Sequence, residues 1–183
     1  MFNCRICTDS PLLSSLFGLP PKPSTSARST ASTRASSATP RRRRDPDSFV
    51  TRDLPSTQKL VSAWENFAHP RAREFFPSPE MLLGVLTQIA RGIRDAEDPV
   101  LGGEEECVHW YGEITKEEPA QAAIRMHKPG EAVESVTFVN RVLVFIFATD
   151  DSFEALMKLP KEPFKMTCGD QLCVNLNHIS TSQ

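Results

Sequence analysis

The segment from residue 166 to 179 carries a compact set of side chains that bind metals. Within it, Cys168, Cys173 and His178 follow one another with the spacing C-x4-C-x4-H. The chain of 183 residues has only five cysteines and four histidines, so chance is a poor explanation for this cluster. Thiolates and an imidazole are ligands that tetrahedral Zn²⁺ prefers, and a closed site of this kind contributes folding free energy directly. The alternative is a pair of small, buried, apolar cysteines beside a surface histidine.

A tetrahedral zinc shell needs a fourth ligand. The nearest candidates upstream are Cys107 and His109, in the stretch Glu-Glu-Glu-Cys-Val-His-Trp-Tyr. We take Cys107, which predicts a structural Zn²⁺ site made of Cys107, Cys168, Cys173 and His178. His109 remains the alternative fourth ligand; if it is not one, we expect it to be a structural histidine.

The sequence from Cys173 to Ile179 is Cys-Val-Asn-Leu-Asn-His-Ile. It resembles the zinc loop of the His-Cys box homing endonucleases and related HNH-type (His-Me finger) nucleases, which usually has the form C-V-N-P-x-H-L. Asn175 is kept, whereas Leu176 replaces the proline. The DNA-binding domain of Smad proteins is similar in the same segment. The resemblance covers about residues 105–183 and implies a His-Me finger-like fold in that part.

The same resemblance places Cys168 at the first zinc-loop cysteine and Cys107 about where the family has an early cysteine ligand. In these nucleases a histidine two residues before that first cysteine is the general base, but this chain has Met166 there. A thioether cannot accept the proton. The metal-binding asparagine expected about nine residues after the zinc histidine is also missing, because the sequence ends at Gln183, five residues past His178. The resemblance therefore implies a domain without catalytic activity.

Two functions follow from this interpretation. The first is a zinc-stabilised, catalytically inactive homing-endonuclease-like domain that binds a protein or a nucleic acid. The second is an active zinc-containing DNA endonuclease whose general base has moved to His109 or His127. Neither implies a small-molecule substrate. A membrane span is not expected either, because the longest apolar run, residues 142–148, is far below the ~20 residues needed.

The first 53 residues differ in composition from the rest. Residues 20–53 are mostly Ser, Thr, Ala, Pro and Arg, which predicts a disordered tail over residues 1–53. The basic block Arg41–Arg44 in that tail indicates nuclear import or contact with phosphate groups, and we expect a nuclear protein. Cys4 and Cys7 form a C-x2-C pair that is either half of a zinc knuckle or two exposed thiols.

Charge is divided unevenly between the tail and the expected domain at residues 54–183. The tail has nine basic and four acidic residues, a net charge of +5, whereas the domain has twelve and nineteen, a net charge of −7. Nucleic-acid binding draws its affinity chiefly from Lys and Arg at phosphates. The acidic domain, with Glu104–Glu106 beside Cys107, therefore argues against a DNA interface at the zinc site.

The pattern of apolar residues predicts a small α+β domain. Residues 54–98 form its helical part, with helices at residues 57–68 and from Pro79, which Ser78 is expected to cap. Strands are expected at residues 107–114, 120–128 and 133–139 in a β-hairpin or meander. A helix from about Asn140, a short helix at residues 151–158 and the zinc loop complete the domain.

Overall fold

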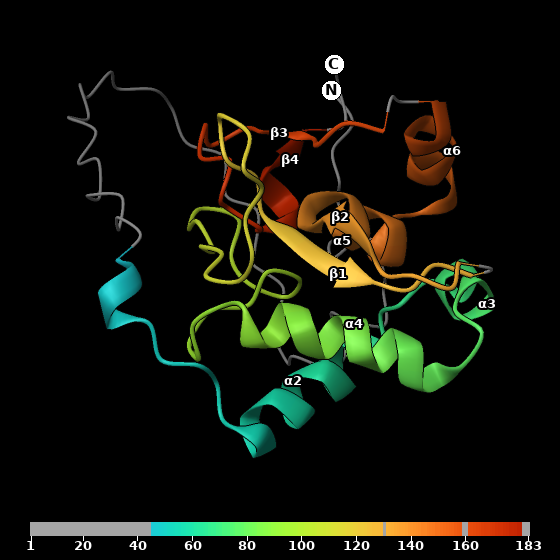
Figure 1. Ribbon diagram of the computed structural model, residues 1–183, viewed down its shortest axis with the longest axis horizontal. Coiled ribbons are helices and arrows are strands. Elements are labelled where there is room, and N and C mark those ends of the chain that lie inside the picture. Colours follow the sequence, from blue (N-terminus) through green and yellow to red (C-terminus); the bar gives the residue numbers. More distant parts are fainter. Residues whose placement is uncertain (1–44, 130, 159–160, 181–183) are drawn as a thin grey trace, which may run out of the picture.

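The computed structural model describes residues 45–129, 131–158 and 161–180 of the chain (Figure 1). Most of the expected tail lies outside these residues, and with it Cys4, Cys7 and the basic block Arg41–Arg44. The predictions made for those residues therefore stay predictions.

The described residues form a small α+β fold with N-terminal helices, a β-hairpin, a further helix and a C-terminal Cys/His cluster, as the sequence predicts. In chain order the elements are η1 (Pro46–Ser48), α2 (Leu54–Glu65), α3 (Pro70–Phe75), α4 (Pro79–Arg91), β1 (Ala123–Met126), β2 (Ser135–Phe138), α5 (Val139–Phe147), α6 (Asp150–Lys158), β3 (Lys165–Met166), η2 (Leu176–His178) and β4 (Ile179–Ser180). Helix α2 packs on α4, and α4 also contacts β1 (Figure 1). Helix α5 contacts β2 and η2, which places the C-terminal loop on the domain.

The two N-terminal helices follow the apolar pattern, with shifts at their ends. Helix α2 starts and stops three residues earlier than predicted, because the Asp53 carboxylate accepts a hydrogen bond from the Ser56 N–H at 2.8 Å and caps it there. Helix α4 starts at Pro79 as predicted, although the Ser78 side chain makes no capping hydrogen bond. The helix α3 was not predicted, since six residues are too few for a periodic pattern.

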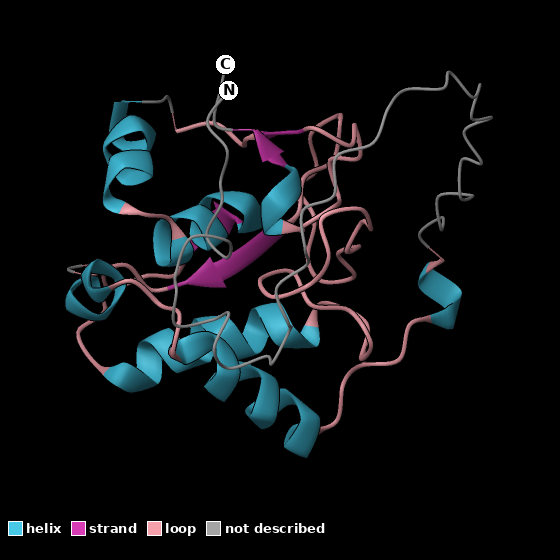
Figure 2. Ribbon diagram, turned by 180° about the vertical axis from the view of Figure 1, so that it is seen from behind, coloured by secondary structure: helices cyan, strands magenta, loops and turns pink. Residues whose placement is uncertain are grey.

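The β-structure is smaller than the sequence predicts. Strands β1 and β2 pair antiparallel, and they form a sheet separate from the short pair β3–β4 (Figure 2). The predicted strand at residues 107–114 is wrong, because only two isolated bridges form in it, at His109 and Ile114. Its backbone groups are shared among different segments: the Trp110 N–H donates to Leu172 and the Tyr111 N–H to Gly92.

The segment Val139–Phe147 is the helix α5, which confirms the expected helix in a stretch whose Val, Ile and Phe content also fits a strand. Almost every residue of α5 is buried, so its apolar surface is not confined to one stripe. Asn140 is buried as well, and its amide donates a hydrogen bond of 2.9 Å to the Phe164 carbonyl oxygen. This bond fixes α5 to the chain that leads into the C-terminal loop.

Residues 45–53, here called the arm, are mostly exposed and contact the folded domain through a few side chains. The Phe49 ring stacks on Tyr111 with ring centres 4.4 Å apart. The buried Arg52 guanidinium donates to the carbonyl oxygens of Arg94 and Glu97 at 2.7 and 2.9 Å. One aromatic ring and one arginine are thus enough to order a segment whose composition is otherwise typical of a tail.

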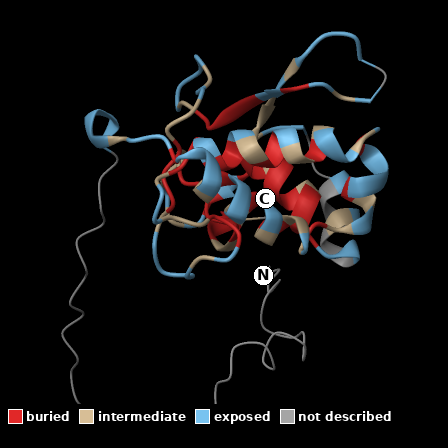
Figure 3. Cartoon of the chain, turned by 90° about the horizontal axis from the view of Figure 1, so that it is seen from below, coloured by how far each residue is buried: buried red, intermediate tan, exposed pale blue. Residues whose placement is uncertain are grey.

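The core lies between the helices and the hairpin (Figure 3). Its largest fully enclosed side chains include Trp64, Trp110 and Phe164. The Trp64 indole N–H donates to the Asp98 carboxylate at 2.9 Å, so the polar edge of the ring has a partner. Among the described residues, no helix is both long and apolar enough to cross a membrane.

The Trp110 ring is held between two glycines, which gives a test of core packing. A methyl group on Gly92 or on Gly112 would overlap this ring, and the ring cannot retreat because it is bounded on both sides. We expect Gly92→Ala to destabilise the fold by about 1–3 kcal/mol. Gly84→Ala on α4 is the matched control, since nothing lies within 4 Å of the added methyl group, and it should stabilise the helix by about 0.5–1 kcal/mol. Thermal denaturation of both variants measures this difference. A Gly92→Ala variant more stable than Gly84→Ala would contradict the packing described here.

Candidate metal centre

The four side chains predicted as zinc ligands come together in the structure. One donor atom from each of Cys107, Cys168, Cys173 and His178 lies within 4.8 Å of the other three. The Nδ1 atom of His178 is 3.4 Å from the sulfur of Cys173 and 3.8 Å from that of Cys107. Zn–S bonds of about 2.3 Å and Zn–N bonds of about 2.0–2.1 Å give tetrahedron edges of roughly 3.5–3.8 Å. The group could therefore hold a metal ion such as zinc.

The His178 ring is oriented so that one nitrogen is available to the cluster. Its Nε2 atom lies 2.8 Å from the Glu104 carbonyl oxygen, which can only accept a hydrogen bond. Nε2 therefore donates to this carbonyl, and Nδ1 is the nitrogen that faces the cysteine sulfurs. The ring is 8% exposed, so its orientation is fixed by the surrounding chain.

Tight turns position the two cysteines of the C-terminal loop. Cys168 follows β3, and the next residue, Gly169, has φ +80°, where glycine is favoured. The Gly169 N–H donates to the Met166 carbonyl at 2.9 Å, and the Cys173 N–H donates to the Asp170 carbonyl at 3.1 Å. The loop from Cys168 to Cys173 is thereby folded back on itself, with both sulfurs on the same side.

Asn175 joins the C-terminal loop to the segment that carries Cys107. It is 1% exposed, and its amide donates hydrogen bonds of 2.8 Å to the carbonyl oxygens of both Gly103 and Glu106. Its side-chain oxygen accepts from the Asn177 N–H at 2.9 Å and so caps η2. The asparagine kept in the zinc-loop motif thus has a structural role outside the metal shell.

Leu176 departs from the motif for a reason that the structure provides. Its N–H donates a hydrogen bond of 2.9 Å to the Pro99 carbonyl oxygen, and its side chain is 2% exposed. A proline at this position would have no N–H to donate. The substitution is therefore matched to the loop before Cys107.

The environment of the sulfurs disfavours thiolates unless a cation is present. Burial raises the pKa of Cys173 far above its ordinary value, and the neighbouring sulfurs of Cys168 and Cys107 raise it further. Burial is also the largest cause of the raised pKa of Cys107, followed by its hydrogen bond with Cys168. A bound divalent cation would supply the charge that lets the three thiols ionise together.

His109, the alternative fourth ligand, is not a member of the cluster. Its Nε2 atom lies 3.3 Å from the Asp170 carboxylate, and its side chain is 6% exposed. The second histidine considered as a general base, His127, is half-exposed and lies 3.7 Å from the Glu134 carboxylate. Met166 is buried on β3 and pairs with Ile179.

Several contributors to this site were not predicted from the sequence. The Glu104 carbonyl and the His109–Asp170 contact depend on where distant segments meet, which no local pattern reveals. The only available signal was Asn175, whose presence in the motif could have indicated a role beside the ligands.

The fold and the cluster together define a small α+β domain with a Cys₃His group suited to a metal ion. Comparisons of the chain with protein-family models, with curated proteins and with solved structures each find no match. The likeness to His-Me finger zinc loops therefore rests on the motif, with the Cys₃His cluster as the structural feature consistent with it.

Asn175→Ala tests whether the polar contacts around the cluster control metal binding. The variant leaves the carbonyls of Gly103 and Glu106 without their donor, which should let the Cys107 segment move away. Loss of partners around a metal site typically lowers metal affinity about 10- to 100-fold, and we expect that range here in a competition titration against a zinc chelator. Asn177→Ala, two residues away, removes none of these bonds and should bind zinc as the wild type does. Equal affinities for the two variants would contradict the role given to Asn175.

Proposed function

We propose that this chain is a zinc-stabilised binding module, built on a homing-endonuclease-like domain that has no catalytic activity. One observation carries the proposal: one donor atom from each of four side chains lies within 4.8 Å of the other three, and three sulfurs with one nitrogen are a donor set of closed tetrahedral zinc sites. Catalytic zinc sites keep a position open for water or substrate, whereas closed sites stabilise the fold. A metal held in this way would attach the C-terminal loop to the segment at Cys107.

The surroundings of the cluster support a structural role over DNA cleavage. The residue at the family's general-base position, Met166, is buried and has no group that accepts a proton. Glu104–Glu106 are exposed beside the site, and negative side chains there would repel phosphates. A protein partner fits this surface better than a nucleic acid does.

The alternative, an endonuclease with a relocated base, has one contact in its favour. His109 beside Asp170 resembles a histidine oriented by a carboxylate, an arrangement found where imidazoles act as bases. With a side chain only 6% exposed, however, His109 has little surface at which a substrate could meet it. His127 is accessible, but it lies beyond the end of β1, and Glu134 is its only ionic partner within the described part of the chain.

We expect the zinc-loaded protein not to cut DNA. Loss of a general base typically lowers a rate ~100- to 10,000-fold, which would put any cleavage near background. The measurement is incubation of the protein with supercoiled plasmid and Mg²⁺, together with elemental analysis that should find one zinc per chain. A double variant, His109→Ala with His127→Ala, is the control. Nicking by the wild type that the double variant lacks would show a relocated base and replace the binding-module proposal.

A further inference from the structure

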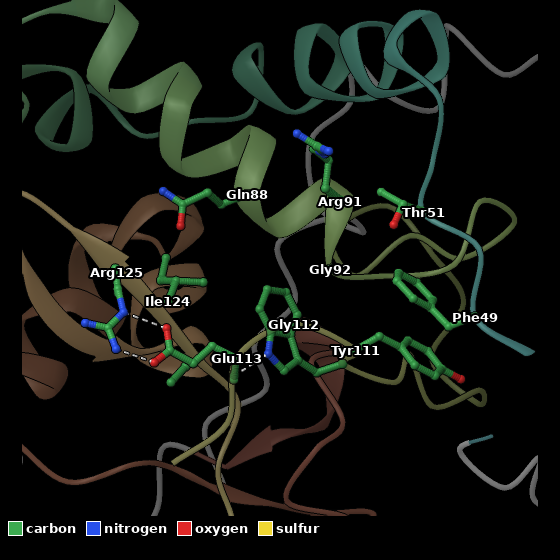
Figure 4. Close-up of a pocket in the computed structure, with 12 residues that line it drawn as sticks. Phe49, Thr51, Gln88, Arg91, Gly92, Tyr111, Gly112, Glu113, Ile124 and Arg125 are labelled. Atoms are coloured by element: carbon green, nitrogen blue, oxygen red, sulfur yellow. Dashed lines mark hydrogen bonds and ion pairs between the residues drawn. The ribbon is translucent and has the colours of Figure 1, made fainter. Parts of the chain in front are cut away.

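An open groove of about 430 Å³ lies away from the metal cluster, between the C-terminal end of α4 and the chain around Tyr111 (Figure 4). The Gln88 and Arg91 side chains come from α4, and Thr51 comes from the arm. Glu113 and Arg125 stand on the opposite side, and the stacked rings of Phe49 and Tyr111 close one end (Figure 4). The size falls within the range of ligand sites, and the open shape suits an extended chain.

The charges that line the groove do not balance. Arg125 is paired with Glu113 through two hydrogen bonds of 2.9 and 2.6 Å, so these two charges cancel. The Arg91 guanidinium is exposed and, within the described residues, has no hydrogen-bond or ion-pair partner. Gln88, one helical turn before Arg91, is also exposed, and so is Thr51 in the arm. Among the described residues neither side chain has a hydrogen-bond partner. The groove thus offers a free cation and two neutral polar groups in a domain of net charge −7.

The arm shows how the surface beside the groove holds an extended segment. Its sequence from residue 45 to 49 is Asp-Pro-Asp-Ser-Phe, an acidic segment that ends in an aromatic ring. Phe49 stacks on Tyr111, while the Arg94 side chain donates to the Ser48 hydroxyl and lies over the same tyrosine, with its guanidinium carbon 5.1 Å from the ring centre. The arm is thus held by a stacked ring and by an arginine that donates to a carbonyl and a hydroxyl oxygen. Arg91, the last residue of α4, offers a second arginine donor in the groove itself.

We propose that this groove binds an extended acidic peptide of a partner protein, with a carboxylate of the peptide on the Arg91 guanidinium. A guanidinium matches a carboxylate with two parallel hydrogen bonds, which favours an acidic side chain over a neutral one. Gln88 and Thr51 would hydrogen-bond the peptide backbone. The inference rests on the proposed function, since it names the partner class of the binding module.

The test uses the full, zinc-loaded chain and a fluorescein-labelled peptide, Asp-Leu-Asp-Glu-Phe-Leu, followed by fluorescence anisotropy. Arg91→Gln should weaken binding about tenfold or more, because a charge-assisted contact is lost. Gln88→Trp should also weaken binding, since it fills the groove without changing the charge. Lys59→Gln removes an exposed cation from α2, outside the groove, and should leave binding unchanged.

Three results would overturn the proposal. They are equal binding by the Arg91→Gln and Lys59→Gln variants, equal binding of a peptide in which Asn and Gln replace the acids, and displacement of the peptide by duplex DNA in an Arg91-dependent manner. Absence of peptide binding to a folded, zinc-loaded chain would likewise reject the groove while leaving the zinc site standing. Zinc content measured on the same samples keeps the two proposals separate, because a chain that binds the peptide but holds no zinc would reject only the metal centre.

Discussion

Removal of zinc from the purified protein is expected to lower its melting temperature by more than about 10 °C, since the metal should contribute several kcal/mol to folding. The loop that bears Cys168, Cys173 and His178 should open first. Its hydrogen exchange should rise strongly, together with that of the segment around Cys107, while α2 and α4 stay protected. The two helices pack on each other in the core, and their contact does not involve the four cluster residues.

Hydrogen exchange followed by mass spectrometry, with and without chelator, measures this effect. Cys173→Ser is the matched variant, because it removes a thiolate ligand and should reproduce the metal-free pattern without chelator. Chelator should then have no further effect on that variant. The buried Phe164, Val174 and Leu176 keep some of the loop's packing in the absence of metal, so opening of the loop and not complete unfolding is expected. An unchanged melting temperature in chelator would reject a structural zinc.

Substitution of Cys107 or His109 should change zinc affinity to very different extents, which separates the two candidates for the fourth ligand. Cys107→Ser should lower zinc affinity beyond the about 10- to 100-fold that changes around a metal shell produce. His109→Ala should keep one zinc per chain, because the histidine contacts the Asp170 carboxylate and is not a member of the cluster. Its affinity should fall only modestly, through a less rigid loop.

Competition titration with a zinc chelator, together with elemental analysis, measures both variants under the same conditions. His109→Asn serves as a control for loss of the ring without loss of a polar side chain. Full zinc content in Cys107→Ser combined with its loss in His109→Ala would show that the structure places the wrong residue in the shell.

The Cys₃His cluster was largely predictable, because its signal lies in rare residue types at a fixed spacing. Cys168, Cys173 and His178 fall within eleven residues, and Cys107, chosen from the sequence over His109, lies with them in the structure. Helix α4 was predictable for a similar reason, since its buried residues recur with a helical period. Features whose residues all lie in one short segment can therefore be recognised from the sequence.

The elements predicted wrongly are those whose partners lie far away. Residues 107–114 have the composition of a strand, yet successive N–H groups there bond to Leu172 and Gly92, in two unrelated parts of the chain. In the arm, Phe49 contacts Tyr111 and Arg52 donates to two carbonyl oxygens in the loop after α4, and composition does not indicate such contacts.

The His178 and Cys107 side chains that meet at the cluster are 71 residues apart in the chain. A metal bound there closes a ring that contains the hairpin, α5 and α6. The entropy cost of closing a loop grows only logarithmically with its length, so doubling the ring would cost about 0.6 kcal/mol. Insertions in the turn between β1 and β2 should therefore be compatible with the same metal centre. Related domains could therefore differ widely in the number of residues between their first and last ligands. The spacing of the ligands within the C-terminal loop would be the better feature by which to recognise such domains.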